Sequence, residues 1–148
     1  MEKVCVFLAD GFEEIEKYRR EKEYEIQNDD NVLNINWKGV GYVNSTKDLD
    51  SGIYYLNEIR INEEERGKGK AKLLLEDYID KVKEDYKAKK IELQVESDEA
   101  KNLPLSKTKE RKELNQNLAK NFYKKLGFKY QLEAHKNEES PILELKIK

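Results

Sequence analysis

Cysteine and histidine are nearly absent from this sequence. Its 148 residues include one cysteine, Cys5, and one histidine, His135. A single thiol excludes an internal disulfide and any site with several thiolates, and a single imidazole excludes a His-rich zinc centre. We therefore expect no metal. Such cysteine usage favours a reducing, cytoplasmic compartment.

A large net charge and a long apolar run are also missing. The 29 basic and 31 acidic residues nearly cancel, which leaves a formal charge of -2, so we expect no nucleic-acid partner. The apolar run 4–8 is followed at once by acidic residues, which fits neither a signal peptide nor a membrane span. We therefore expect no membrane association, and the run predicts a buried strand followed by a short helix.

What is present is a clear pattern of apolar residues, which predicts one domain over residues 1–148. Helical spacing predicts helices from Ala71 to Tyr86 and from Leu114 to Leu126, and Gly127 ends the second. The polar segment 98–115 contains Pro104 and lacks a sustained period, which indicates a surface insertion. Strands are predicted at 24–27, 32–37, 40–44, 53–61, 91–95, 128–132 and 142–147.

The segment Arg66-Gly67-Lys68-Gly69-Lys70-Ala71 lies between the strongest strand signal and the first helix. Free amides at a helix start, glycines that allow close approach and four basic side chains, at positions 66, 68, 70 and 72, suit a diphosphate. Two glycines before a helix are also typical of a simple flexible connection. The spacing matches neither a Walker loop nor a dinucleotide-binding fingerprint.

This loop resembles the acetyl-CoA loop of the GCN5-related N-acetyltransferases (the GNAT family), whose pattern is Gln/Arg, two residues, Gly, one residue, Gly/Ala. Residues 56–61, Leu-Asn-Glu-Ile-Arg-Ile, are similar to the fourth strand of that family. Residues 116–128 are similar to its second motif, Asn-x-x-Ala and then Tyr-x-Lys-x-Gly-Phe, although Gln116 takes the asparagine position and Asn117 follows it.

The resemblance implies an α/β (α+β) fold: a GNAT-like mixed, mostly antiparallel splayed sheet with helices on both faces. It implies direct transfer of an acetyl group from acetyl-CoA, in a ternary complex, to a primary amine of a small molecule or a protein. A catalytically silent acyl-CoA-binding sensor or regulatory module is the alternative. The residues that the resemblance places at the cofactor are Ile59, Arg60, Ile61, Arg66, Gly67, Lys68, Gly69, Lys70, Ala71, Lys72, Asn117 and Lys125.

Two residues are candidates for catalysis. Glu58 lies on the strand that by resemblance lines the cleft, where a carboxylate can take a proton from the amine directly or through water. The alternatives are Glu92 and Glu96, or an exposed Glu58 paired with a lysine. Tyr123 takes the position of a tyrosine that the family often places near the sulfur of CoA, although it could instead be a packing residue of the helix.

Three further expectations concern other parts of the chain. Residues 3–16 resemble the amino-terminal strand and turn of the DJ-1/PfpI family, but the chain has no downstream cysteine to act as that family's nucleophile. Cys5 is expected to be an inert buried thiol, and His135 a surface residue near a turn. The sequence does not decide the oligomeric state, and the apolar strand 142–147 is a candidate for pairing across a homodimer.

Overall fold

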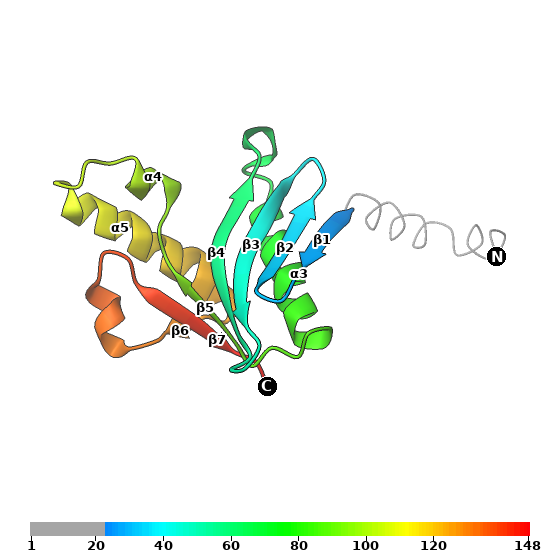
Figure 1. Cartoon of the computed structure of the whole chain (residues 1–148). Helices are drawn as coiled ribbons and strands as arrows, with labels where there is room; N and C mark the ends of the chain where they lie inside the picture. The colour runs from blue at the N-terminus through cyan, green and yellow to red at the C-terminus, as the bar shows by residue number, and fades with distance from the viewer. Residues whose placement is uncertain (1–22) are drawn as a thin grey trace, which may run out of the picture.

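The computed structural model describes residues 23–148, so the expected first strand and helix, Cys5 and the DJ-1-like segment lie outside the described residues. No helix in the described part is long and apolar enough to cross a membrane. One seven-stranded sheet organises the chain (Figure 1). Its strands are β1 (Tyr24–Asn28), β2 (Val32–Trp37), β3 (Gly41–Asp48), β4 (Ile53–Ile61), β5 (Lys90–Gln94), β6 (Lys129–Tyr130) and β7 (Ile142–Lys146).

The helices follow the expected order. They are η1 (Glu63–Glu65), α3 (Lys70–Glu84), α4 (Asp98–Lys101), α5 (Thr108–Leu118), the π-helical turn η2 (Ala119–Tyr123), η3 (Lys124–Leu126) and η4 (Glu133–Asn137). The boundaries of β4 agree with the sequence, and α3 begins one residue before the expected start.

The sheet order is β1-β2-β3-β4-β5-β7-β6, and every neighbouring pair is antiparallel except β4 and β5. The predicted mixed, mostly antiparallel sheet is therefore confirmed. Strand β7 pairs with β5 on one side and with β6 on the other. It is therefore an interior strand, and β6 occupies its second edge at Leu143 and Glu144.

Strands β4 and β5 stay together for only four residue pairs, from Ile53–Lys90 to Leu56–Leu93. Beyond that point β4 continues to Ile61 beside β3, whereas β5 continues beside β7. The predicted splay is thus present, and it leaves one edge of the second half of β4 without a neighbouring strand.

A β-bulge accompanies this splay. Ser45 pairs with Leu56 and Asn44 pairs with Glu58, so Asn57 is the extra residue in β4. A bulge of this kind reverses which residues face each side of a strand. Before it Tyr54 and Leu56 are buried, and after it the odd-numbered Ile61 is buried.

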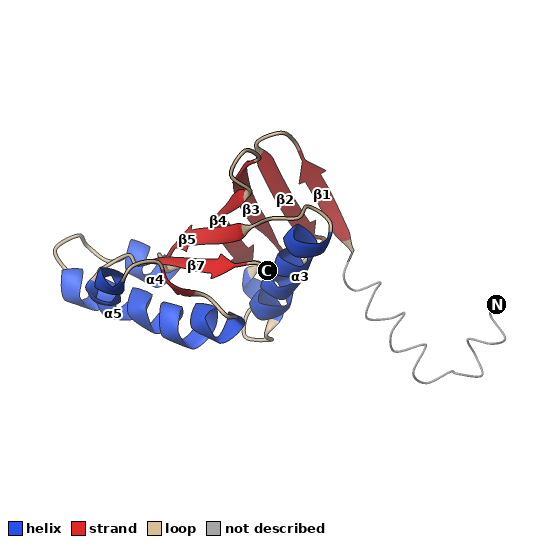
Figure 2. Ribbon diagram, turned by 90° about the horizontal axis from the view of Figure 1, so that it is seen from below, coloured by secondary structure: helices blue, strands red, loops and turns tan. Residues whose placement is uncertain are grey.

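The core lies on one face of the sheet. Leu74, Leu75, Tyr78 and Val82 of α3 are fully buried in a cluster with the inward side chains of β2 to β5. Figures 1 and 2 place α3 and α5 on the same side of the sheet, where the apolar side chains of the described strands gather.

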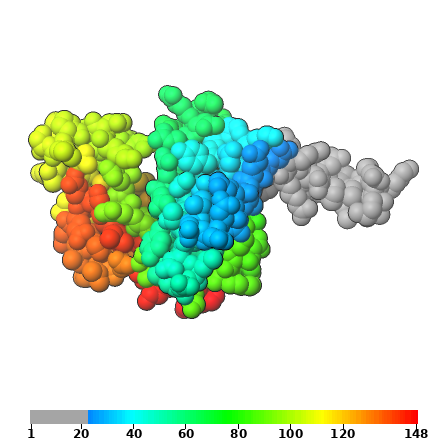
Figure 3. Space-filling model, viewed as in Figure 1, coloured from blue at the N-terminus to red at the C-terminus, as the bar shows by residue number. Residues whose placement is uncertain are grey.

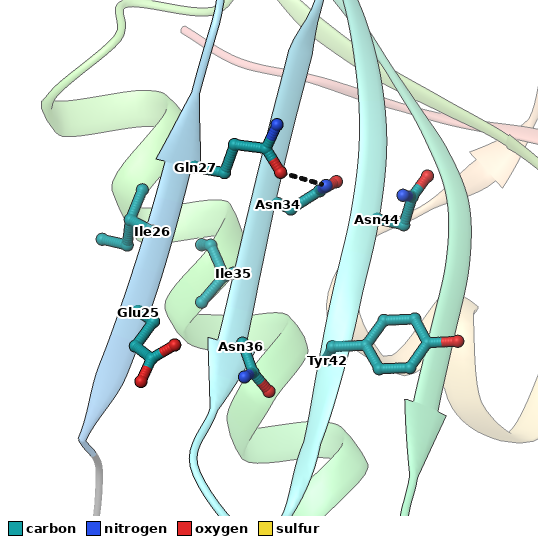
Figure 4. A pocket seen from close by; sticks show the side chains of 8 residues that line it. All are labelled: Glu25, Ile26, Gln27, Asn34, Ile35, Asn36, Tyr42 and Asn44. Atoms are coloured by element: carbon teal, nitrogen blue, oxygen red, sulfur yellow. Dashed lines mark hydrogen bonds between the residues drawn. The ribbon is translucent and has the colours of Figure 1, made fainter.

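The other face of β1 to β3 carries carboxamide side chains and is called the amide face here. It is defined by Gln27, Asn34, Asn36 and Asn44, which occupy successive cross-strand positions. A hollow of about 530 Å³ lies on it (Figure 4). Asn34 Nδ2 donates to Gln27 Oε1 across 3.1 Å. Such a polar surface does not require an apolar helix to cover it.

Segment 98–115 is mostly helical, with α4 and the first part of α5 held by buried polar side chains. The guanidinium of buried Arg111 donates to the carbonyls of Ala100 (2.8 Å) and Leu103 (3.0 Å) and pairs with Glu139. The amide of fully buried Asn115 accepts from Ser97 N at 2.8 Å and donates to Glu139 O at 2.7 Å. These bonds fix the segment against the sheet.

Gln116 holds the next loop in the same way. Its Nε2 donates to the carbonyls of His135 (3.0 Å) and Glu138 (2.8 Å), and its Oε1 accepts from Tyr130 Oη at 2.6 Å. His135 is buried, and its Nδ1 lies 2.6 Å from Glu138 Oε2. The expectation that His135 lies on the surface is therefore wrong, because η4 folds back onto α5.

We predict that Arg111→Met lowers the free energy of unfolding by about 3 kcal/mol, because it leaves two carbonyls and a carboxylate without their buried partner. Lys109→Met, at an exposed position on the same helix, should change it by less than about 0.5 kcal/mol. Urea denaturation of both variants measures this difference. A loss below about 1 kcal/mol for Arg111→Met would show that the segment is held mainly by other contacts.

Candidate acetyl-CoA site

A cleft of about 820 Å³ opens where β4 and β5 diverge. Figure 3 shows the surface hollowed between the strands and the segment of α4 and α5. Ile59 of β4 faces the side of the helices, whereas Glu58 faces the opposite side, so the cleft passes through the plane of the sheet. Its lining residues are Tyr55, Leu56, Asn57, Glu58, Ile59, Arg66, Ala71, Glu92, Leu93, Gln94, Glu96, Ser97, Asp98, Glu99, Lys101, Leu118, Phe122, Tyr123 and Ile142.

At the helix side of the cleft lies the glycine loop. Gly67 and Gly69 have φ angles of 76° and 75°, which only glycine adopts without strain. A Cβ on either would meet nothing within 4 Å, so the backbone conformation and not crowding requires glycine there. The loop is therefore open to a ligand on its outer side.

The start of α3 presents free amides to this loop. Gly69 is the N-cap residue, and no described side chain caps the helix. The amides of the first turn, residues 70–72, have no carbonyl partner within a helix, and they carry the positive end of the helix dipole. Together with the glycine conformations, they can bind the oxygens of a diphosphate.

The basic side chains of the loop have different partners. Arg66 Nε donates to Ile61 O at 2.8 Å, which ties the loop to the end of β4. Glu65 lies between Lys68 (3.0 Å) and Lys70 (2.9 Å), and hydrogen bonds from Lys70 and then Lys68 lower the pKa of its carboxyl. The two lysines are thus held beside the free amides.

Glu58 lies on the other side of the sheet, at the mouth of the cleft. Its Oε1 accepts from Tyr42 Oη at 2.9 Å, and its Oε2 lies 3.3 Å from Arg60 Nε. The hydrogen bond from Tyr42 is the largest cause that lowers the pKa of Glu58, with Arg60 adding to it and partial burial opposing it. The carboxylate is therefore ionised at neutral pH.

Tyr123 lies in the cleft at the last position of the π-helical turn η2. It is 8% exposed, and its hydroxyl makes no hydrogen bond with residues 23–148. Burial raises the pKa of this hydroxyl to about 12, so it keeps its proton at neutral pH. A π turn widens a helix by one residue and is frequent at functional sites.

The structure brings part of the predicted site into the cleft. Glu58, Ile59, Arg66, Ala71 and Tyr123 line it, as do the alternative bases Glu92 and Glu96. Glu92 is paired with Lys90 at 3.1 Å, and Glu96 lies 3.7 Å from Arg111. The remaining predicted residues are outside the lining, and they are Arg60, Ile61, Gly67, Lys68, Gly69, Lys70, Lys72, Asn117 and Lys125.

Sequence reasoning missed several lining residues. Phe122 was expected to be a packing residue, but together with Leu118 it forms part of the apolar wall. The rim residues Ser97, Asp98, Glu99 and Lys101 lie at or in the predicted insertion, which carried no motif. The described residues contain no group of three or more His, Cys, Asp or Glu that could hold a metal ion.

A family model of the acetyltransferase (GNAT) family matches residues 5–128. The chain belongs to this family. No curated protein matches the sequence significantly. The GNAT assignment agrees with the order of the strands, with the parallel pair that separates and with the glycine loop that follows β4.

Solved structures share the GNAT fold at low identity. The PaiA N-acetyltransferase of Thermoplasma acidophilum, in complex with coenzyme A, is 18% identical with a TM-score of 0.55, over 78% of this chain and 61% of that one. This chain thus spans less than two thirds of that protein. The ribosomal-protein-S18-alanine N-acetyltransferase of Escherichia coli is 17% identical with a TM-score of 0.57, over 89% of this chain and 76% of that one.

A third similar structure is that of mutant forms of the spermidine/spermine N-acetyltransferase SpeG of Vibrio cholerae. It is 17% identical with a TM-score of 0.55, over 92% of this chain and 75% of that one. At these identities the three structures support the fold and do not decide the acceptor.

We predict that Tyr42→Phe raises the pKa of Glu58, because the hydrogen bond from Tyr42 is the main cause of its lowered pKa. A carboxyl-carbon NMR titration of Glu58 measures the change. Tyr55→Phe removes a hydroxyl that is not among the groups lowering this pKa, and it should leave the value unchanged. Equal shifts in both variants would contradict the assignment.

Proposed function

We propose that this GNAT chain transfers the acetyl group of acetyl-CoA to a primary amine by direct attack in a ternary complex. The observation that carries the proposal is the cleft itself. The glycine loop, with its free amides and basic side chains, adjoins the cleft at Arg66 and Ala71. The ionised carboxylate of Glu58 and the protonated phenol of Tyr123 both line the cleft. These match the needs of a diphosphate, an amine and a thiolate respectively.

The glycine loop would hold the diphosphate of CoA. From there the pantetheine arm would run along the free edge of β4 beyond Leu56, where β5 has turned away. Backbone groups on this edge can bond the amides of the arm as a neighbouring strand would. The apolar side chains of Leu118 and Phe122 would cover the opposite side of the arm.

In the transfer step the amine nitrogen forms a bond to the acetyl carbon while the bond from that carbon to sulfur breaks. The nitrogen loses a proton, and the departing thiolate gains one. An alkyl ammonium has a pKa of about 10.4, so the amine must first be deprotonated. Glu58, whose lowered pKa makes it a weak base, would accept this proton through water while its charge orients the amine.

Tyr123 would act on the thiolate as a hydrogen-bond donor. Its pKa of about 12 lies above that of a thiol, about 8.5, so it does not give up its proton completely. The proton that the thiolate finally takes can come from the nitrogen. A main-chain amide of β4 near Arg60 and Ile61 would polarise the acetyl oxygen.

We predict that saturating CoA raises the melting temperature by roughly 5 °C or more, and that Gly69→Asp removes most of this shift. An aspartate there adds bulk and negative charge at the free amides. Gly39→Asp is the matched control, because Gly39 has φ 77° and open space around its added Cβ but lies in the turn before β3. Differential scanning fluorimetry measures both, and equal shifts in the two variants would contradict the diphosphate site.

We predict that Tyr123→Phe lowers kcat about tenfold, which is the effect of losing a hydrogen bond of about 1.5 kcal/mol to a developing thiolate. The affinity for CoA should stay nearly unchanged. Tyr86→Phe, outside the cleft, is the control. A thiol-release assay measures kcat and also separates an enzyme from a sensor, since a sensor binds CoA without turnover.

A further inference from the structure

The mouth of the cleft on the Glu58 side is strongly acidic. The lining of the whole cleft includes five carboxylates and two cations, and of these two Arg66 belongs to the glycine loop and Lys101 to α4. One of the carboxylates comes from β4, two come from β5 and the residues directly after it, and two come from α4. The five carboxylates belong to Glu58, Glu92, Glu96, Asp98 and Glu99.

The cations behind this lining do not neutralise it. Arg60 lies 3.3 Å from Glu58 and 3.8 Å from Asp98, so one guanidinium serves two carboxylates. Arg111 is shared in the same way by Glu96 at 3.7 Å and by Glu139.

Lys90 repeats this sharing on β5. It lies 3.1 Å from Glu92 and 3.6 Å from Glu144. Glu99 has no ion pair within the described residues. Glu144 has a second cation, since Lys146 lies 3.8 Å from it. The shared Arg60 and Arg111, together with Glu99, therefore leave negative charge at the mouth that these cations do not fully balance.

The acidity is local to the cleft. On the neighbouring amide face the hollow is lined by neutral amides and by a single carboxylate, Glu25 (Figure 4). Tyr42, which lines that hollow, also bonds Glu58. The negative charge is thus concentrated beside β4 and α4 rather than spread over this whole side of the sheet.

A separate observation indicates that the cleft is built for a ligand. Tyr123 is more than nine-tenths buried, it lines the same cleft, and its hydroxyl has no hydrogen-bond partner in residues 23–148. Among the described residues the fully buried side-chain atoms without a partner are Asn34 Oδ1 and Tyr78 Oη, so the Tyr123 oxygen reaches the cleft, where it can bond a ligand. Leu118 and Phe122 beside it form an apolar passage between the loop and the acidic mouth.

We propose that the acceptor is a small amine with a second positive charge, such as an alkyl diamine, whose distant ammonium binds the acidic rim of α4. This inference rests on the proposed acetyl transfer. The reacting nitrogen gives its proton up and forms the amide bond, while the distant nitrogen stays protonated beside Asp98 and Glu99. Acetylation removes one of the two positive charges, which weakens binding of the product at this rim.

Three amines of equal chain length test the proposal: 1,4-diaminobutane, n-butylamine and 4-aminobutyrate. We expect kcat/KM to be highest for the diamine and lowest for the amino acid. The advantage of the diamine over n-butylamine should shrink as the salt concentration rises, since exposed charges are screened.

The double variant Asp98→Asn, Glu99→Gln should lower kcat/KM for the diamine about tenfold, which corresponds to about threefold for each exposed charge. It should change kcat/KM for n-butylamine by less than about twofold. The control Glu110→Gln, Glu113→Gln removes two exposed charges from α5 outside the cleft. It should change neither value.

Several results would overturn the inference. Equal kcat/KM for the diamine and n-butylamine would do so while leaving acetyl transfer intact, and so would turnover of a lysine peptide without turnover of the diamine. If no amine is acetylated, the melting temperature of the CoA complex still tests the rim. The diamine should raise it more than n-butylamine does, and only in proteins that keep Asp98 and Glu99. Failure of CoA itself to bind would instead contradict the proposed function.

Discussion

The separation of β4 and β5 is the constraint on which the rest of the site depends. Two parallel strands that pair over four residues and then diverge must leave backbone groups without sheet partners. The protein keeps β5 bonded to β7 and β4 bonded to β3, so the opening has a stable wall on each side. The side chain of Arg66 donates a hydrogen bond to the carbonyl of Ile61 and so fixes the far end of β4. The cleft is thus a gap within a rigid sheet.

Buried polar side chains hold the second wall in place together with apolar packing. Arg111, Asn115 and Gln116 are buried on α5. Arg111 bonds carbonyls in and directly after α4, whereas Asn115 and Gln116 both bond the loop before β7. A buried polar side chain of this kind is costly unless all its bonds are made together. The result is that α4, the loop before β7 and the cleft rim share one set of anchors.

Much of the fold was predictable from the sequence. The apolar pattern of residues 53–61 and of α3 specified those elements directly, and the glycine loop between them predicted an anion site. The bulge at Asn57 also left a signal, because the buried apolar residues change there from even to odd positions. The family resemblance supplied the splay, which no local pattern contains.

The parts that were missed depend on contacts between distant segments. Segment 98–115 is ordered because Arg111 and Asn115 bond residues that precede and follow them in the chain. A polar sequence without a regular period does not predict such bonds. His135 was expected on the surface because it lies near a turn. The side chain of Gln116, however, donates hydrogen bonds to the carbonyls of His135 and Glu138 and so holds η4 against α5. The acidic rim was missed for the same reason, since its charges come from β4, β5 and α4.

The π-helical turn η2 has a consequence for the spacing of the chain. A helix advances about 100° for each residue, so one residue added within a turn changes the heading of everything after it. Here the wider turn sets the orientation of Tyr123 relative to the anchors on α5, which lie before it. If residues 119–123 formed regular α-helix at the same chain length, Tyr123 and the residues after it would be rotated by about 100° relative to these anchors. The orientation of the phenol in the cleft therefore depends on the π turn as well as on the side chains around it.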